Sequence, residues 1–216
     1  MAFDIHQLDD LEDRDDAAME AFLDELLELF CESPEGQAYQ QIVPDMGFWV
    51  GRLIDYGYIY CGATLPQMDV DDVEELLSDI FPRKITIGSP DETADALPEL
   101  LAFWTYVQRE YQLPQAESIL RYLRDLSPAT FHAWMMDPTR FGMAKSFMMG
   151  GRTAGFDMRD PHEHAAYANL YNATAMAQES DVSLPRAVGR SPQATAKARR
   201  QRKLAKASRK KNRKRK

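Results

Sequence analysis

The sequence predicts an all-α protein, with a single multi-helix domain of about seven to nine helices, an acidic N-terminal segment and a disordered basic C-terminal tail. Three observations lead to this fold class. Apolar residues recur at helical spacing through most of the chain. Several segments begin with Ser or Asp followed by Pro, a pattern that starts helices. We also find no two strong strand-like segments that could pair into a sheet.

The first fifteen residues are dominated by Asp and Glu, so we expect a flexible acidic segment over 1–15. Over residues 17–31, apolar side chains repeat at positions i, i+3, i+4 and i+7. This spacing predicts an amphipathic helix with an acidic outer face. Residues 33–36 contain Pro and Gly and should end that helix.

Residues 46–60 are apolar and rich in Phe, Trp and Tyr, but they include Gly51 and Gly57, which disfavour a helix. The run 55–61 also fits a strand, with 85–87 as the other candidate strand. A lone pairing of two such short strands would be marginally stable. We therefore predict a buried helix over 46–60.

Later helices are marked by a capping residue followed by proline, whose missing N–H leaves no donor unsatisfied at the first helical position. These pairs begin at Ser89, Ser127, Asp137, Asp160 and Ser191. Glu92 and Glu163 complete a capping box at two of them. Asp69 with Asp72 forms a weaker version of the same start.

The helices expected from these patterns span residues 17–31, 46–60, 69–80, 90–111, 115–126, 128–136, 138–150 and 161–179. Pro98 should split the fourth helix, because proline removes an interior hydrogen bond and clashes with the preceding turn. Near residue 180 apolar residues become sparse, and Pro and Gly interrupt any long helix. We therefore expect a helical domain over 16–179, a linker over 180–196 and a disordered tail over 197–216.

Apolar residues make up 44% of the chain, which is enough for a real core. No run approaches the roughly 18 apolar residues that span a bilayer. The acidic N-terminus has neither the basic nor the apolar region of a secretory signal. We expect a cytoplasmic protein, or a nuclear one if the source is eukaryotic. Cys31 and Cys61 form no close pair, and we expect two buried free thiols.

The 26 Lys and Arg residues are unevenly distributed. Residues 197–216 hold 13 of them and no Asp or Glu, whereas residues 1–196 hold the other 13 and all 34 acidic residues. The formal charge of −8 is therefore the sum of −21 in the body and +13 in the tail. Such a division points to an interaction tail. The candidate phosphate-binding residues are Lys197, Arg199, Arg200, Arg202, Lys203, Lys206, Arg209, Lys210, Lys211, Arg213, Lys214, Arg215 and Lys216.

A polycation of this density binds phosphates with release of counterions, and hence with steep salt dependence. The tail holds no aromatic residue, which favours backbone contacts over base stacking and leaves specificity to the helical body. We therefore expect a non-enzymatic protein that binds RNA or DNA, including a ribosome surface. Two other interpretations remain open. The tail could act as a nuclear-import signal, or it could bind the protein's own acidic body, an acidic partner or a membrane surface.

The acidic segment 1–15 is typical of a solubilising surface. A sharper hypothesis is that it shields the tail until nucleic acid displaces it. Deletion of residues 1–16 should then tighten nucleic-acid binding at low salt.

Six of the eleven methionines lie within residues 135–158, interspersed with aromatic residues. Met suits adaptable binding surfaces, although a methionine-rich core is the simpler interpretation. The alternative function is a protein-interaction or chaperone-like adaptor, with the tail serving only for localisation. The candidate partner surface comprises Met135, Met136, Met143, Met148 and Met149.

Two further motifs have the wrong spacing for chemistry. Gly150-Gly151-Arg152 lacks the order of a P-loop, so we expect its glycines to end a helix. His162 and His164 are two positions apart, which places them on different helical faces. We find no nucleophile elbow and no Cys with an obvious His partner, and we expect no catalytic site, metal or cofactor.

Four short stretches carry a resemblance: DIFPRK at 79–84 with LPELLAFW at 97–104, and FGMAKS at 141–146 with AGFDM at 154–158. The first two resemble an uncharacterised helical domain of bacterial proteins. The last two are similar to conserved hypothetical proteins of cyanobacteria. The resemblance covers roughly residues 30–175 and implies a bacterial, cytoplasmic, helical protein. It implies no activity and no site residues.

Overall fold

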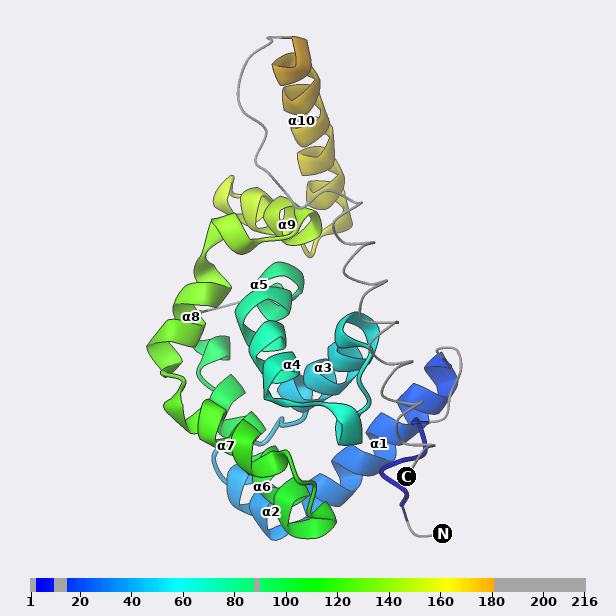
Figure 1. The fold of residues 1–216 in the computed structure, drawn as a ribbon. Coiled ribbons are helices and arrows are strands. Elements are labelled where there is room, and N and C mark those ends of the chain that lie inside the picture. Colours follow the sequence, from blue (N-terminus) through cyan, green and yellow to red (C-terminus); the bar gives the residue numbers. More distant parts are fainter. Residues whose placement is uncertain (1–2, 10–14, 88–89, 181–216) are drawn as a thin grey trace. The chain divides into compact units, whose positions relative to one another are not determined.

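The computed structural model describes residues 3–9, 15–87 and 90–180 (Figure 1). The chain divides into two compact units, Met1–Lys145 and Ser146–Lys216. Every regular element in the described ranges is helical, which confirms the predicted all-α fold. The helices are α1 (Asp16–Glu32), α2 (Pro34–Gln40), α3 (Phe48–Tyr56), α4 (Val70–Glu75), α5 (Phe81–Lys84), α6 (Ala96–Tyr111), α7 (Ala116–Asp125), α8 (Pro128–Met136), α9 (Met143–Thr153) and α10 (Pro161–Ser180).

The short elements between these helices are helical turns. Two are π-helical, Gly57–Cys61 after α3 and Leu76–Ile80 after α4. Three are 3-10 turns, Leu65–Gln67, Pro90–Thr93 and Pro138–Arg140. The alternative strand over 55–61 is therefore wrong, because those residues end α3 and form a π turn.

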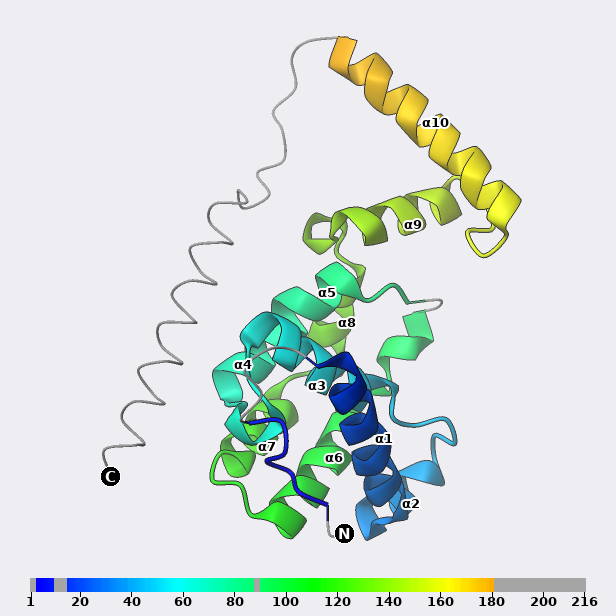
Figure 2. The same cartoon turned by 90° about the vertical axis from the view of Figure 1, so that its right-hand side faces the viewer.

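Helix α6 is central to the first unit, where it packs against α2, α3 and α7 (Figures 1 and 2). Its Phe103 and Trp104 are fully buried. Phe30 of α1 meets Phe103 edge-on, with 5.4 Å between ring centroids. Burial of each such side chain stabilises the fold by roughly 1.5–3 kcal/mol, so this aromatic layer is a major part of the core.

Helix α1 is amphipathic as predicted. Its buried residues follow the helical spacing of three and four: Met19, Phe22, Leu26 and Phe30. The outer face carries six exposed carboxylates: Asp16, Glu20, Asp24, Glu25, Glu28 and Glu32. Since α1 contains no Lys or Arg, this face is strongly negative.

Local capping places several helix starts. Ser33 accepts a hydrogen bond from the Gly36 backbone N at 3.1 Å, so the segment expected to end α1 also begins α2. Ser127 accepts one from the Thr130 backbone N at 3.1 Å and starts α8. Asp69 and Asp72 form a complete capping box at α4.

The helix start expected at Asp137 differs in the structure. At Asp137 the chain forms only a 3-10 turn, and α9 begins at Met143 instead of 138. The Gly142 backbone N donates to the Arg83 carbonyl oxygen at 3.0 Å, which ties the intervening chain to the end of α5. The predicted starts at Ser89 and Ser191 lie outside the described residues.

Pro98 does not split a helix. Helix α6 begins at Ala96, after the 3-10 turn, so Pro98 is its third residue. A backbone N–H in the first turn has no partner inside the helix, and its absence at Pro98 removes no helical hydrogen bond.

Residues 3–9, which the structure describes within the segment expected to be flexible, pack against the first unit. Ile5 and Leu8 are buried in the core of the first unit, and Phe3 packs against that core. Asp9 accepts a hydrogen bond from the Thr64 hydroxyl. Deletion of residues 1–16 would therefore remove part of the core as well as negative charge, and it does not isolate an electrostatic effect.

The N-terminus of α3 is capped from a distance. Its N-cap residue, Gly47, has φ +108° and no side chain to accept a hydrogen bond. The buried Glu99 carboxylate of α6 accepts one from the Val50 backbone N at 2.9 Å. Burial raises the pKa of Glu99, while hydrogen bonds from the backbone of α3 oppose that shift.

Candidate nucleic-acid interface

The predicted phosphate-binding residues, 197–216, lie outside the described residues, but the two units divide the charge of the whole chain. Residues 1–145 hold 9 Lys or Arg and 29 Asp or Glu, a net charge of −20. Residues 146–216 hold 17 and 5, a net charge of +12. The net positive charge therefore lies in the sequence range 146–216, which also contains α10 and most of α9.

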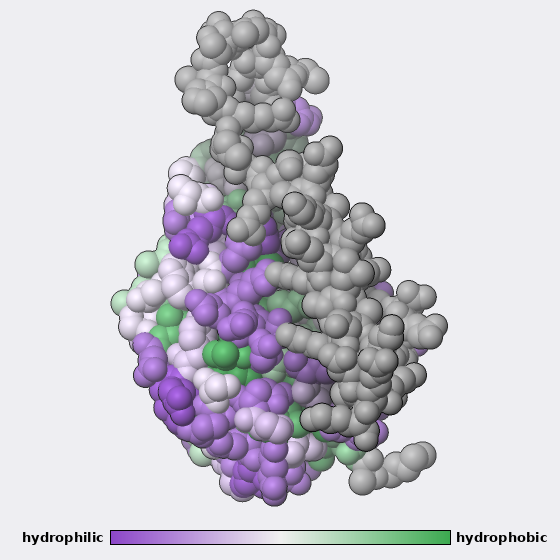
Figure 3. Space-filling model, in the orientation of Figure 1, coloured by the Kyte–Doolittle hydropathy of each residue, from purple (hydrophilic) through white to green (hydrophobic). Residues whose placement is uncertain are grey.

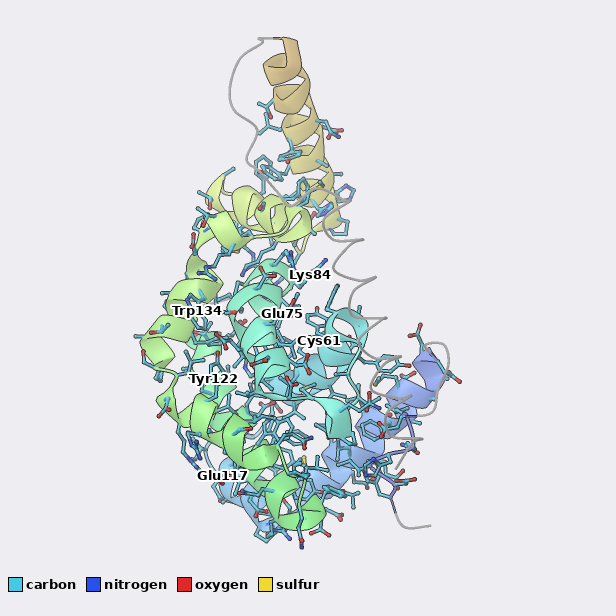
Figure 4. The ribbon with its side chains drawn as sticks, viewed as in Figure 1. Cys61, Glu75, Lys84, Glu117, Tyr122 and Trp134 are labelled. Atoms are coloured by element: carbon cyan, nitrogen blue, oxygen red, sulfur yellow. The ribbon has the colours of Figure 1, made fainter. Side chains whose placement is uncertain are left out.

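Several basic side chains of the first unit are engaged within it. Arg83 pairs with Asp79 at 2.9 Å, and Arg109 pairs with Glu35 at 2.8 Å. Lys84 lies over the Tyr60 ring, 5.2 Å from its centre (Figure 4). These contacts, together with the net charge of −20, disfavour a phosphate-binding surface on this unit.

Lys145 is fully buried at the end of the first unit. Its Nζ donates to the Met135 and Pro82 carbonyl oxygens at 2.8 and 3.0 Å. It also lies 4.2 Å from the centre of the Phe141 ring. Burial lowers the pKa of Lys145 to about 8. This amine joins the ends of α5 and α8 and is inaccessible to a phosphate.

A cavity of about 240 Å³ in the first unit combines apolar and acidic side chains. Its lining comprises Val43, Asp45, Phe48, Trp49, Glu92, Asp95 and Glu99. Four of these seven residues are carboxylates, which repel phosphate. We assign no part of the nucleic-acid interface to this cavity.

On the face shown in Figure 3, hydrophilic residues cover much of the first unit, and hydrophobic residues form small separate patches. The five methionines of the predicted partner surface are distributed over both units. Met135 is fully buried in the core, Met136 packs against it, and Met143 is 86% exposed. Met148 and Met149 belong to the second unit and are half-buried. A partner surface made of all five stays a prediction.

In the second unit, α9 presents a glycine face to the chain that follows it. A Cβ at Gly150 would overlap the Tyr167 hydroxyl of α10, and one at Gly151 would overlap the Met158 side chain. The two glycines are therefore packing positions inside α9. The expectation that they end the helix is wrong, and the chain instead ends α9 at Thr153.

The actual end of α9 is a Schellman motif. Gly155 adopts φ +88°, and its backbone N donates to the Arg152 carbonyl oxygen at 3.0 Å. The Phe156 backbone N donates to the Gly151 carbonyl oxygen, also at 3.0 Å. This turn reverses the chain, so Phe156 packs against Tyr167 with ring centroids 5.4 Å apart.

Asp160 starts α10 as the sequence predicts. Its carboxylate accepts hydrogen bonds from the backbone N atoms of His162 at 2.7 Å and Glu163 at 3.1 Å. The Glu163 carboxylate reaches back to the Asp157 backbone N instead of the Asp160 N that a capping box requires. The turn before α10 and the first turn of α10 are therefore joined by hydrogen bonds in both directions: Asp160 accepts from the helix, and Glu163 of the helix accepts from the turn.

The turn joins α9 to α10 (Figure 2), and aromatic rings of the two helices contact one another. The Phe147 ring lies 5.0 Å from Tyr167, 5.3 Å from His164 and 5.4 Å from Tyr171, measured between centroids. We define the aromatic face as Phe147, Phe156, His164, Tyr167 and Tyr171. Phe147, Phe156 and Tyr167 are half-buried, whereas His164 is exposed.

The outer part of this face is open to solvent. Tyr171 is 43% exposed, and the neighbouring Leu170 is 48% exposed. His164, Tyr167 and Tyr171 follow helical spacing of three and four, a signal present in the sequence. Sequence reasoning missed the face because it did not examine the aromatic spacing within 161–179.

The sequence also led to predictions about two histidines, a metal site and two cysteines. His162 and His164 are exposed, and the His164 ring contacts Phe147. Among the described residues, no group of three or more His, Cys, Asp or Glu is arranged to hold a metal ion. Cys31 and Cys61 are not joined in a disulfide, and they are half-buried instead of fully buried as expected.

None of the helices in the described ranges is long and apolar enough to cross a membrane. Comparison with protein-family models, with curated proteins and with solved structures found no match. The resemblance to an uncharacterised bacterial helical family stays a prediction.

Proposed function

We propose that the protein is a non-enzymatic, cytoplasmic, nucleic-acid-associated protein that binds phosphates through residues 197–216. The observation that carries this proposal is the division of charge, with +12 in the second unit and −20 in the first. Thirteen cations in the last twenty residues make a site for a polyanion of high charge density, such as RNA, DNA or a ribosome surface.

The two charges have different roles in this proposal. The tail supplies affinity through phosphate contacts, which carry no sequence information. The first unit repels phosphate and keeps nucleic acid on the second unit. The first unit serves as a partner-recognition module. The exposed acidic face of α1 is a surface that a partner could recognise.

The adaptor alternative has weaker support. It requires the methionines to form one accessible surface, whereas Met135 is fully buried and the others are distributed over both units. A single exposed Met143 does not make a groove for a partner helix.

The test is recovery of nucleic acid with the full-length protein purified from cells, with and without nuclease. In one variant all 13 tail Lys and Arg residues are replaced with Gln. In the matched control every tail Lys is replaced with Arg, which keeps the charge. We expect nuclease-sensitive recovery with the wild type and the control, and loss of recovery with the Gln variant. Equal recovery with the Gln variant would contradict the proposal, and separate RNase and DNase treatments identify the nucleic acid.

A further inference from the structure

We propose that the aromatic face of α9 and α10 stacks on the bases of a single-stranded nucleic acid. This inference rests on the proposed function and names its ligand class. The tail follows α10 along the chain, so one polyanion can contact both the tail and the aromatic face. The tail then binds phosphates, and the face supplies the base contacts that the tail, without aromatic residues, lacks.

The rings of the aromatic face are more exposed than those of the core. A ring cluster that only joined two helices would be expected to bury its rings, as the aromatic layer of the first unit does with Phe30 and Phe103 at 0% exposure. In the second unit Tyr171 is 43% exposed, although its ring contacts Phe147. The Phe147 contact holds the Tyr171 ring in place while part of its surface faces solvent. A fixed, half-exposed ring is a suitable stacking platform, since little side-chain entropy remains to be lost.

The spacing of Tyr167 and Tyr171 determines where a base can stack. The Tyr167 and Tyr171 centroids are 6.2 Å apart, and their planes are inclined by 49°. A base sandwiched between two parallel rings needs roughly 6.8 Å, twice the base-stacking distance of about 3.4 Å. The pair is too close and too inclined for that, so a base stacks on the open side of Tyr171 instead of between the rings.

Base faces are accessible to an aromatic side chain in a single strand but not in a duplex. In a duplex both faces of each base are covered by its neighbours, so a ring on a protein surface meets only base edges. In a single strand the bases unstack at small cost and offer their faces to aromatic side chains. The tail binds phosphates of either form. The aromatic face should therefore add affinity for single strands alone.

The experiment uses the full-length protein and two labelled probes, a 20-nucleotide oligo(dT) and a 20-base-pair duplex. Tyr171→Leu removes the ring but keeps an apolar contact with α9, and Tyr171→Phe keeps the ring. The exposed neighbour Asn172→Ala is the matched control. We expect Tyr171→Leu to weaken oligo(dT) binding by roughly fivefold or more, the lower limit for loss of one stacked base. Oligo(dT) affinity should stay within about twofold of the wild type for Tyr171→Phe and for Asn172→Ala. Duplex affinity should stay within about twofold of the wild type for all three variants.

A second readout needs no substitution. Ultraviolet crosslinking of the wild-type protein to an oligonucleotide with halogenated uracil bases should attach the probe to the α10 peptide that contains Tyr171. Equal oligo(dT) affinity of Tyr171→Leu and wild type, with no crosslink in α10, would overturn the inference. The inference would also be overturned if Tyr171→Leu altered self-association of the protein but left oligo(dT) affinity unchanged. The aromatic face would then bind a second copy of the protein.

The two proposals fail in different ways. If replacement of the tail cations with Gln abolishes nucleic-acid binding and Tyr171→Leu does not alter it, the base-stacking role of the aromatic face is wrong and the proposed function of the tail stands. If neither probe binds the wild-type protein in a salt-dependent manner, the proposed function itself is wrong.

Discussion

Replacement of Glu99 tests the long-range cap of α3. Glu99→Ala removes the carboxylate and leaves the Val50 backbone N–H buried without its acceptor. An orphaned buried donor costs roughly 1–3 kcal/mol. For a unit of this size each kcal/mol corresponds to about 2–4 °C in Tm, so we expect a Tm lower by several degrees. Glu99→Gln keeps an oxygen acceptor and removes the buried charge, so it should be close to the wild type at neutral pH.

The pH dependence of the same pair has a definite sign. Because the pKa of Glu99 is raised above 4.5 in the folded protein, the folded state binds more protons than the unfolded state just above pH 4.5. Stability from this group therefore falls as pH rises through the window between 4.5 and the folded-state pKa. The wild type should gain stability relative to Glu99→Gln as pH is lowered through that window. Other carboxylates are common to both proteins and cancel in the difference.

The assay is urea unfolding followed by tryptophan fluorescence. All three tryptophans, Trp49, Trp104 and Trp134, lie in the first unit, so the signal reports that unit alone. A Glu99→Gln variant as unstable as Glu99→Ala would show that the charge, and not the acceptor, supports α3. A stability difference between wild type and Glu99→Gln that does not vary with pH would refute the raised pKa.

Three further predictions use the same fluorescence assay. Gly36→Ala should lower the free energy of unfolding by about 1–3 kcal/mol, because the new Cβ would overlap a backbone carbonyl oxygen. Gly51→Ala has open space around its Cβ and should raise the free energy of unfolding by about 0.5–1 kcal/mol. Equal effects of the two substitutions would contradict the packing described for these glycines. Tyr106→Phe should lower the free energy of unfolding by about 1 kcal/mol, because the Tyr106 hydroxyl forms a hydrogen bond with another tyrosine. Tyr122→Phe (Figure 4) should be neutral or stabilising, because the Tyr122 hydroxyl is buried without a hydrogen-bond partner. A larger loss of stability for Tyr122→Phe than for Tyr106→Phe would contradict both assignments. With the Lys145 pKa lowered to about 8 from 10.5, this group binds more protons in the unfolded chain between these values, so the stability of the wild type relative to Lys145→Met should rise with pH in that window. A difference between the two proteins that does not vary with pH would contradict the lowered pKa.

Features that depend on nearby residues could be predicted from the sequence. The caps at Ser127 and Asp160 connect a side chain to backbone groups two or three residues away, so the sequence pattern contains the whole interaction. The same holds for α1, whose apolar spacing determines which face is buried.

Features that depend on distant residues could not be predicted in this way. Glu99 caps a helix that begins about fifty residues earlier, and Gly142 is fixed by the carbonyl of Arg83. Burial of Ile5 and Leu8 depends on a surface built by later helices, and the acidic residues around them conceal that pattern. In the candidate interface, the charge of the tail is evident from the sequence. The ring cluster needs the Schellman turn at Gly155, which brings Phe156 against α10.

The salt dependence of nucleic-acid binding tests the central proposal most directly. The measurement compares the wild-type protein with a full-length variant in which the six tail arginines are replaced with Gln, using a single-stranded probe over a range of salt concentrations. The logarithm of the binding constant should fall linearly with the logarithm of salt concentration. Loss of six phosphate contacts should reduce the magnitude of that slope by about four. Binding that is independent of salt, or an equal slope for both proteins, would contradict the role proposed for the tail.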